Sequence, residues 1–243
     1  MWKNIGYEQC LSFINCQLRP GTTGSLARAA IRPSITISRM TGSGGRSVAS
    51  LLTDYLTTHT PADCHWTVFD KNLIERVLED HHLPKRVADY MPEGHRAMLG
   101  DMLEELLGMH PSSWTLVQKT SETILRLVKV GCVILVGRGA NVVTSKLENV
   151  FHVRLVGSLE KRTKRVQEAY SLDEHHALKF IAKEDKGRRR FLKEHFDTDI
   201  DDPLLYHLII NTDRIRYEDA AQLIGNEVIR RYHLERPVHA VAA

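Results

Sequence analysis

Residues 34–52, which read SITISRMTGSGGRSVASLL, join an apolar run to a glycine cluster and then to a helical pattern. Ile35 and Ile37 alternate with polar residues, which is typical of a strand. The turn that follows contains three glycines, Gly42, Gly44 and Gly45. A strand that turns through glycines into a helix directs backbone N–H groups at an anion. The stretch therefore predicts a phosphate-binding loop, and a plain strand-to-helix turn is the alternative.

The loop departs from the general pattern GxxxxGK[ST], because Gly45 stands where the lysine belongs. Ser47 provides a hydroxyl suited to Mg²⁺, and Arg39 and Arg46 flank the loop. We predict that Arg46 directs its guanidinium at the phosphates, since its planar fork suits bidentate contact. The alternative is that both arginines face solvent. The predicted phosphate-binding residues are Thr41, Gly42, Ser43, Gly44, Gly45, Arg46 and Ser47.

Strands and helices alternate along the rest of the chain. Apolar runs predict strands at residues 34–38, 66–70, 132–137, 150–156 and 206–211. Five such alternations predict an α/β fold with a five-stranded parallel sheet covered by helices on both faces. Ligands of these sheets bind beyond the carboxyl ends of the strands. The loop, Asp70, Arg138 and Asn211 all follow or end predicted strands, so we expect them to share one cleft.

The chain divides into one domain with short additions. We predict an N-terminal helical appendage and linker at residues 1–33, a domain at residues 34–232 and a tail at residues 233–243. An amphipathic helix in the appendage is a candidate for self-association. Within the domain, helical patterns fill residues 71–130 and 173–202.

Composition narrows the class of protein. The 243 residues are 42% hydrophobic and 26% charged, as in a globular domain. A net charge of +3 argues against a dedicated nucleic-acid-binding protein, and no apolar run is long enough to span a membrane. The 13 histidines show no metal-ligand spacing. Four cysteines without a CxxC pair predict reduced thiols and a cytoplasmic protein. They are Cys10, Cys16, Cys64 and Cys132.

Several segments resemble one family in the right order. SRMTGSGGRSVA resembles the glycine loop of cytidylate kinases, and VILVGRGANVV resembles their strand ending in Gly-Arg-Asp, with Gly139 in place of the aspartate. NVFHVRLVGSLEKRTKRV, KEDKGRRRFLKEHF and LIINTDRIRYEDAAQLI are more similar to the divergent branch called cytidylate kinase-like proteins. In that branch an opening ISR…GSGG without lysine is the usual form. The resemblance covers about residues 34–232.

The resemblance implies a P-loop kinase architecture of three α/β/α layers. Residues 71–130 would form the insertion that binds the monophosphate, and residues 173–202 the lid over the phosphates. The implied reaction is phosphoryl transfer from ATP, with Mg²⁺, to a nucleoside monophosphate, most readily CMP or dCMP.

The resemblance also implies roles for individual residues. Successive helical residues diverge by about 100°, so a run of three arginines cannot face one ligand. We expect Arg188 and Arg190, together with Arg46, to stabilise the transferring group. The acceptor would be held by Asp70, Arg76 and Arg138, and the metal by Ser47 and Asp70. A solvated helix face is the alternative for the lid arginines, and a helix N-cap for Asp70.

A second function from a different class stays open. The missing lysine and Gly139 fit a nucleotide-binding regulatory protein of the kinase fold with little or no transfer activity.

Overall fold

The computed structural model describes residues 32–62, 64–70 and 115–235. Its centre is a five-stranded sheet with the order β2-β3-β1-β4-β5, in which every pair is parallel. This confirms the predicted fold class and the predicted number of strands. The strands are β1 (Ser34–Arg39), β2 (Thr67–Phe69), β3 (Val133–Val136), β4 (Val150–Val156) and β5 (Leu208–Asn211).

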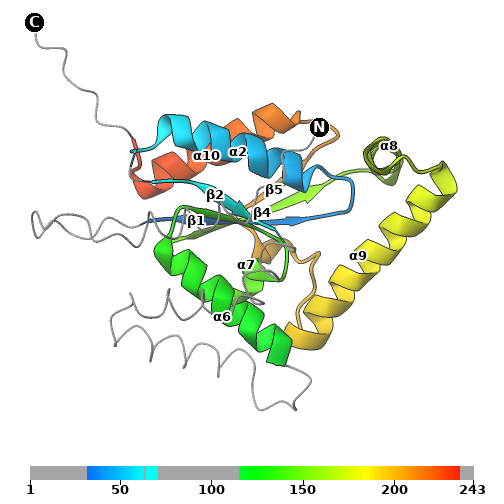
Figure 1. Cartoon of the computed structure of the whole chain (residues 1–243), viewed down its shortest axis with the longest axis horizontal. Coiled ribbons are helices and arrows are strands. Elements are labelled where there is room, and N and C mark those ends of the chain that lie inside the picture. Colours follow the sequence, from blue (N-terminus) through cyan, green and yellow to red (C-terminus); the bar gives the residue numbers. More distant parts are fainter. Residues whose placement is uncertain (1–31, 63, 71–114, 236–243) are drawn as a thin grey trace, which may run out of the picture.

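Helices cover both faces of the sheet and form three layers (Figure 1). α2 and α10 pack together on one face, and α6 and α7 lie on the other. α8 and α9 extend from one side of the body. The helices are α2 (Gly45–His59), α6 (Thr115–Val130), α7 (Ala140–Val143), α8 (Leu159–Tyr170), α9 (Glu174–Phe196), the 3₁₀ turn η2 (Pro203–Leu205) and α10 (Tyr217–Tyr232).

The alternation in β1 decides which face carries the main core. Ile35 and Ile37 are fully buried in the cluster that also contains Leu52 and Leu56 of α2. Successive strand residues point to opposite faces, so Thr36 points away from this cluster. Its hydroxyl lies 2.8 Å from the His152 ring. Apolar burial therefore fixes β1 beneath α2, and with it the start of the loop.

α8 and α9 both begin at residues suited to a helix N-terminus. The Ser158 hydroxyl accepts a hydrogen bond from the Lys161 amide, and the Asp173 carboxylate accepts one from the His176 amide. Such caps stabilise the first turn of a helix. α9 occupies most of the segment predicted as a lid, and its lid function stays a prediction.

Cys64 and Cys132 are joined in a disulfide with a Cα–Cα distance of 5.7 Å. The prediction that all cysteines are reduced is therefore wrong for this pair. Cys64 precedes β2 and Cys132 precedes β3, and these two strands are neighbours in the sheet. The expected cytoplasmic location stays a prediction and loses the support of free thiols.

Several predictions fall on residues outside the described ranges. They concern nearly all of the appendage, the insertion ahead of α6, most of the tail, Arg76, Cys10 and Cys16. Among the described helices, none has both the length and the apolar character needed to cross a membrane.

Candidate phosphate-binding site

The loop between β1 and α2 needs glycine at two positions. Gly42 and Gly44 have φ angles of 79° and 84°, which favour glycine. A Cβ at Gly42 would lie 2.6 Å from the Arg162 carbonyl oxygen, and one at Gly44 would collide with the Tyr217 ring. The positive φ angle and the lack of space therefore both exclude a side chain at Gly42 and at Gly44. The contacts with Arg162 of α8 and Tyr217 of α10 fix the path of the loop.

The start of α2 offers unpaired backbone donors. Gly44 precedes the helix, and no side chain caps the helix there. The Val48 amide donates to the Gly44 carbonyl at 2.9 Å, which leaves the preceding helical amides without a helical partner. Amides of this kind, with the helix dipole, favour a phosphate. Ser43 has both of its donors occupied, because its hydroxyl donates to the Met40 and Leu155 carbonyls and its amide donates to the Met40 carbonyl at 3.2 Å.

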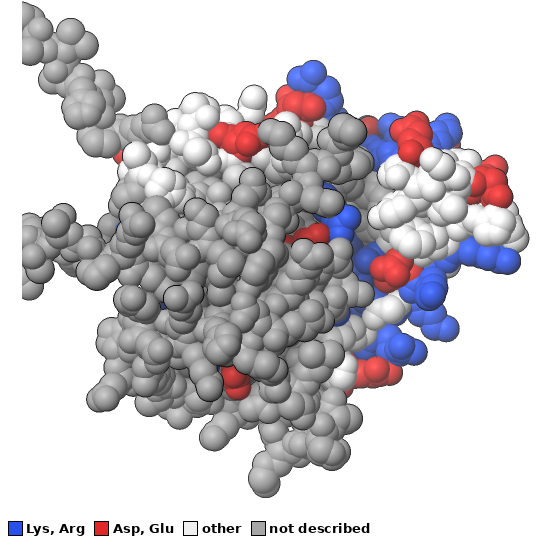
Figure 2. All heavy atoms as spheres, in the orientation of Figure 1, with Lys and Arg blue, Asp and Glu red and all other residues white. Residues whose placement is uncertain are grey.

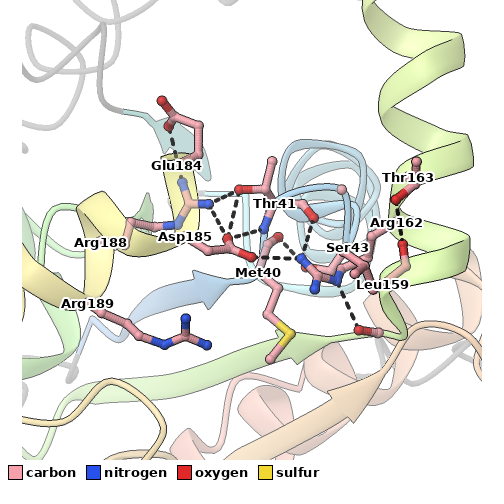
Figure 3. A network of polar contacts seen from close by, with 12 residues as sticks. Met40, Thr41, Ser43, Leu159, Arg162, Thr163, Glu184, Asp185, Arg188 and Arg189 are labelled. Carbon is pink, nitrogen blue, oxygen red and sulfur yellow. Dashed lines mark hydrogen bonds and ion pairs between the residues drawn. The ribbon is translucent and has the colours of Figure 1, made fainter. Parts of the chain in front are cut away.

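Asp185 of α9 joins the loop to α8 and α9 (Figure 3). Its Oδ1 accepts hydrogen bonds of 2.8 Å from both the amide and the hydroxyl of Thr41. Oδ2 accepts from Arg162 at 2.7 Å, and Oδ1 accepts from Arg188 at 2.6 Å. Burial alone would raise the pKa of Asp185, but these hydrogen bonds hold that pKa below its usual value. The carboxylate is therefore ionised at neutral pH.

Arg165 of α8 supports the other side of the loop. It donates to the Thr212 carbonyl at 2.8 Å and to the Gly42 carbonyl at 3.4 Å. It also lies 5.5 Å from the centroid of the Tyr217 ring and 3.4 Å from the Asp213 carboxylate. These contacts tie the loop to the segment that follows β5.

Arg46 and Asp70 lie together beside the loop, as the convergence of strand ends predicts. Arg46 Nη2 is 2.9 Å from Asp70 Oδ2, and the Arg46 side chain is 60% exposed. The Ser47 hydroxyl has no hydrogen-bond partner in the part of the chain that the structure describes. A hydroxyl and a carboxylate are ligands that Mg²⁺ accepts, so Ser47 and Asp70 fit a magnesium ion bound with phosphates.

The structure separates the two predicted lid arginines. Arg188 contacts Asp185 and the Thr41 hydroxyl at the loop. Arg190 is 70% exposed and lies 3.8 Å from Glu194 on its own helix, so it makes none of the contacts that hold Arg188 at the loop, and its role stays a prediction. Residues two positions apart in a helix diverge by about 200°, which explains the separation. Arg189 turns toward Asp201, at 3.0 Å.

Arg138 lies in the turn that follows β3. It has a φ angle of 58° between Gly137 at 89° and Gly139 at 67°. Gly137 contacts the Arg39 guanidinium, which brings this turn to the edge of the loop.

Sequence reasoning missed Arg162, Arg165 and Asp185 as site residues. A signal for the two arginines was present: they follow β4 at its carboxyl end and lie three residues apart, on one helix face. Asp185 gave no such signal, because a carboxylate in a basic segment also fits a solvated helix.

Basic side chains lie along the α8 and α9 side of the molecule, mixed with acidic ones (Figure 2).

A glycine loop between the first strand and its helix, at the carboxyl edge of a five-stranded parallel sheet, defines a P-loop kinase fold. The sequence model of the cytidylate kinase-like family matches residues 34–214 of this chain. The chain belongs to this family.

Among solved structures, an uncharacterised protein from Eubacterium ventriosum is similar over 82% of this chain and 99% of its own, with a TM-score of 0.64 and 20% identity. Shikimate kinase from Bacteroides thetaiotaomicron matches 80% of this chain and 97% of its own, with a TM-score of 0.44 and 12% identity. Comparison with curated proteins gives no match.

Proposed function

We propose that this protein transfers a phosphoryl group from ATP to a nucleoside monophosphate, with CMP or dCMP as the preferred acceptor. Family membership supports a nucleotide kinase-like protein. The observation that carries the proposal is the uncapped start of α2, with Arg46 in its first turn and Arg162 and Arg188 held at the loop by Asp185. Phosphoryl transfer needs such positioning and positive charge, and little covalent chemistry from the protein.

In the proposed reaction an acceptor phosphate oxygen bonds to the γ-phosphorus, the bond to the bridging oxygen of ADP breaks, and ADP leaves. The amides at the start of α2 would hold the donor phosphates. Arg188 would neutralise charge on the transferring group, and Arg46, in the first turn of α2, would add to this neutralisation. Asp70 orients Arg46 through their ion pair. Magnesium held by Ser47 and Asp70 would, when bound, neutralise the β- and γ-phosphates.

Acceptor-dependent release of ADP tests the proposal. The full chain is incubated with ATP, Mg²⁺ and each of CMP, dCMP, UMP, AMP and GMP in a coupled assay. CMP and dCMP should give the highest turnover, and Arg188→Ala should lower it about 100-fold. The matched control is Arg230→Ala, an exposed arginine of α10 that pairs with Glu227. Failure of every acceptor to stimulate ADP release would contradict transfer.

A nucleotide-binding regulatory role is the second candidate. A carboxylate of the protein, Asp185, already accepts from the Thr41 amide of the loop, and position 45 lacks the lysine. Titration calorimetry with ATP separates the two functions. Tight binding without turnover supports regulation, and acceptor-dependent turnover excludes it.

A further inference from the structure

The cation that the loop lacks at position 45 has a counterpart six residues earlier. With Gly44 as the second glycine of GxxxxGK, the pattern places the first glycine at position 39 and the lysine at position 45. This chain has Arg39 and Gly45 there. The glycine and the cation of the pattern have therefore exchanged positions.

The Arg39 side chain fills the space beside Gly45. A Cβ built on Gly45 would lie 2.9 Å from Arg39 Cγ and 3.3 Å from Arg39 Cδ. A Cβ built on Gly137 would lie 3.0 Å from Arg39 Cζ and still closer to Nη1. The side chain thus runs from the first residue of α2 to the turn after β3, and it depends on glycine at both positions.

The surroundings of Arg39 are those of a group that binds an anion. In residues 32–62, 64–70 and 115–235, no hydrogen bond or ion pair ends on its guanidinium, whereas Arg46, Arg162 and Arg188 each pair with a carboxylate. Burial, followed by the charges of Arg188 and Arg46, lowers the pKa of Arg39 to about 10, and the weaker effects of the Asp70 and Glu184 carboxylates oppose this shift. The group is still charged at neutral pH. A partly buried cation beside two others is stabilised by a bound polyanion.

We propose that Arg39 replaces the loop lysine and binds the β- and γ-phosphates of a nucleoside triphosphate. This inference rests on the proposed function for the identity of the ligand. Arg39 belongs to β1 and reaches the phosphates from the sheet, whereas the lysine of the pattern belongs to the helix. Its planar fork offers two parallel donors in place of a point charge.

Calorimetry of ATP binding to Arg39→Gln tests the role without requiring turnover. The substitution should weaken ATP binding about 100-fold, or about 2.8 kcal/mol. Arg230→Ala, which removes the same charge from the exposed end of α10, should bind ATP like the unmodified protein. The unfolding temperature of Arg39→Gln should stay equal or rise, because the change removes a partly buried cation that Arg188 and Arg46 repel more strongly than Asp70 and Glu184 attract it.

Two further variants distinguish the effect of the position of the Arg39 side chain from the effect of its charge. Gly45→Ala adds one methyl group against Arg39 and changes no charge, so it should weaken ATP binding at least about tenfold, although alanine is the better helix residue. The double change Arg39→Gly with Gly45→Lys restores GxxxxGK and should recover most of the binding lost in Arg39→Gly alone.

The outcomes separate this inference from the proposed function. If the wild-type protein binds ATP but phosphorylates no acceptor, the transfer reaction is refuted. The role of Arg39 is then still decided by the ATP affinity of Arg39→Gln relative to wild type. Arg39→Gln binding ATP within about threefold of wild type would overturn the inference. So would a fall in unfolding temperature that accompanies the lost binding, or a wild-type protein that binds neither ATP nor tripolyphosphate.

Discussion

Replacing Asp185 with asparagine should remove a large part of the attachment between the loop and α9. The carboxylate accepts from the amide and hydroxyl of Thr41 and from Arg162 and Arg188. The side chains of Asp185 and Arg162 are only 14% and 9% exposed, so solvent screens their ion pair weakly. Removing one partner of a buried pair costs about 3–5 kcal/mol. Asparagine keeps one acceptor oxygen, so we expect a loss of about 3 kcal/mol, or about 6–12 °C in unfolding temperature.

Urea unfolding of Asp185→Asn, followed by circular dichroism, measures this loss. The control is Asp197→Asn, because Asp197 is exposed, pairs with Lys193 and has a φ angle of 46° that asparagine accepts. Its unfolding midpoint should not change. A loss below about 1 kcal/mol for Asp185→Asn would refute the inferred strength of the attachment.

The same variant has a defined pH dependence. The pKa of Asp185 is lowered in the folded protein, so the unfolded chain takes up the proton first as the pH falls. The stabilisation is therefore complete at neutral pH and disappears as the pH falls through the folded pKa. The difference between wild type and Asp185→Asn should shrink below about pH 4. A difference that stays constant on acidification would show that the carboxylate charge is not its source.

Three other predictions concern stability. Reduction of the disulfide between Cys64 and Cys132, which spans 68 residues, should lower the free energy of unfolding by about 4 kcal/mol in urea, and an equal midpoint with and without reductant would contradict it. Arg154 is 4% exposed, pairs with Asp201 and donates to Ser38, so Arg154→Ala should lose about 3 kcal/mol, measured in the same assay. Burial lowers the pKa of His152 to about 4, so the unfolded chain binds its proton first and stability should fall between about pH 6.5 and pH 4. His152→Gln should flatten that slope in thermal unfolding.

The fold was predictable because its signals are local. An apolar run placed β4 at residues 150–156, as observed. The prediction for β5 began two residues early, at Tyr206, although the His207 amide still donates to the His152 carbonyl of β4 at 2.8 Å. The Tyr206 hydroxyl donates to the Ile200 carbonyl at 2.7 Å, and the His207 ring accepts from the His152 amide. A sequence gives no sign of such long-range partners.

The disulfide illustrates information that only the topology supplies. Cys64 and Cys132 are far apart in sequence, and no CxxC spacing links them. They become neighbours because β2 and β3 pair in parallel, with Thr67 opposite Val133. Strand order therefore had to be known before the pairing could be inferred.

The position of Arg39 follows from the same alternation that predicted β1. Ile35, Ile37 and Arg39 are two residues apart, so they share the face of the sheet that α2 covers. Arg46 lies in the first turn of α2 on its exposed side, where a guanidinium reaches Asp70 more readily than the loop. A cation on the strand is fixed to the sheet, and Arg39 reaches the loop only past Gly45 and Gly137. The position of the Arg39 guanidinium therefore depends on both glycines as well as on the arginine. A comparison with the lysine position of the P-loop pattern alone does not detect this arrangement.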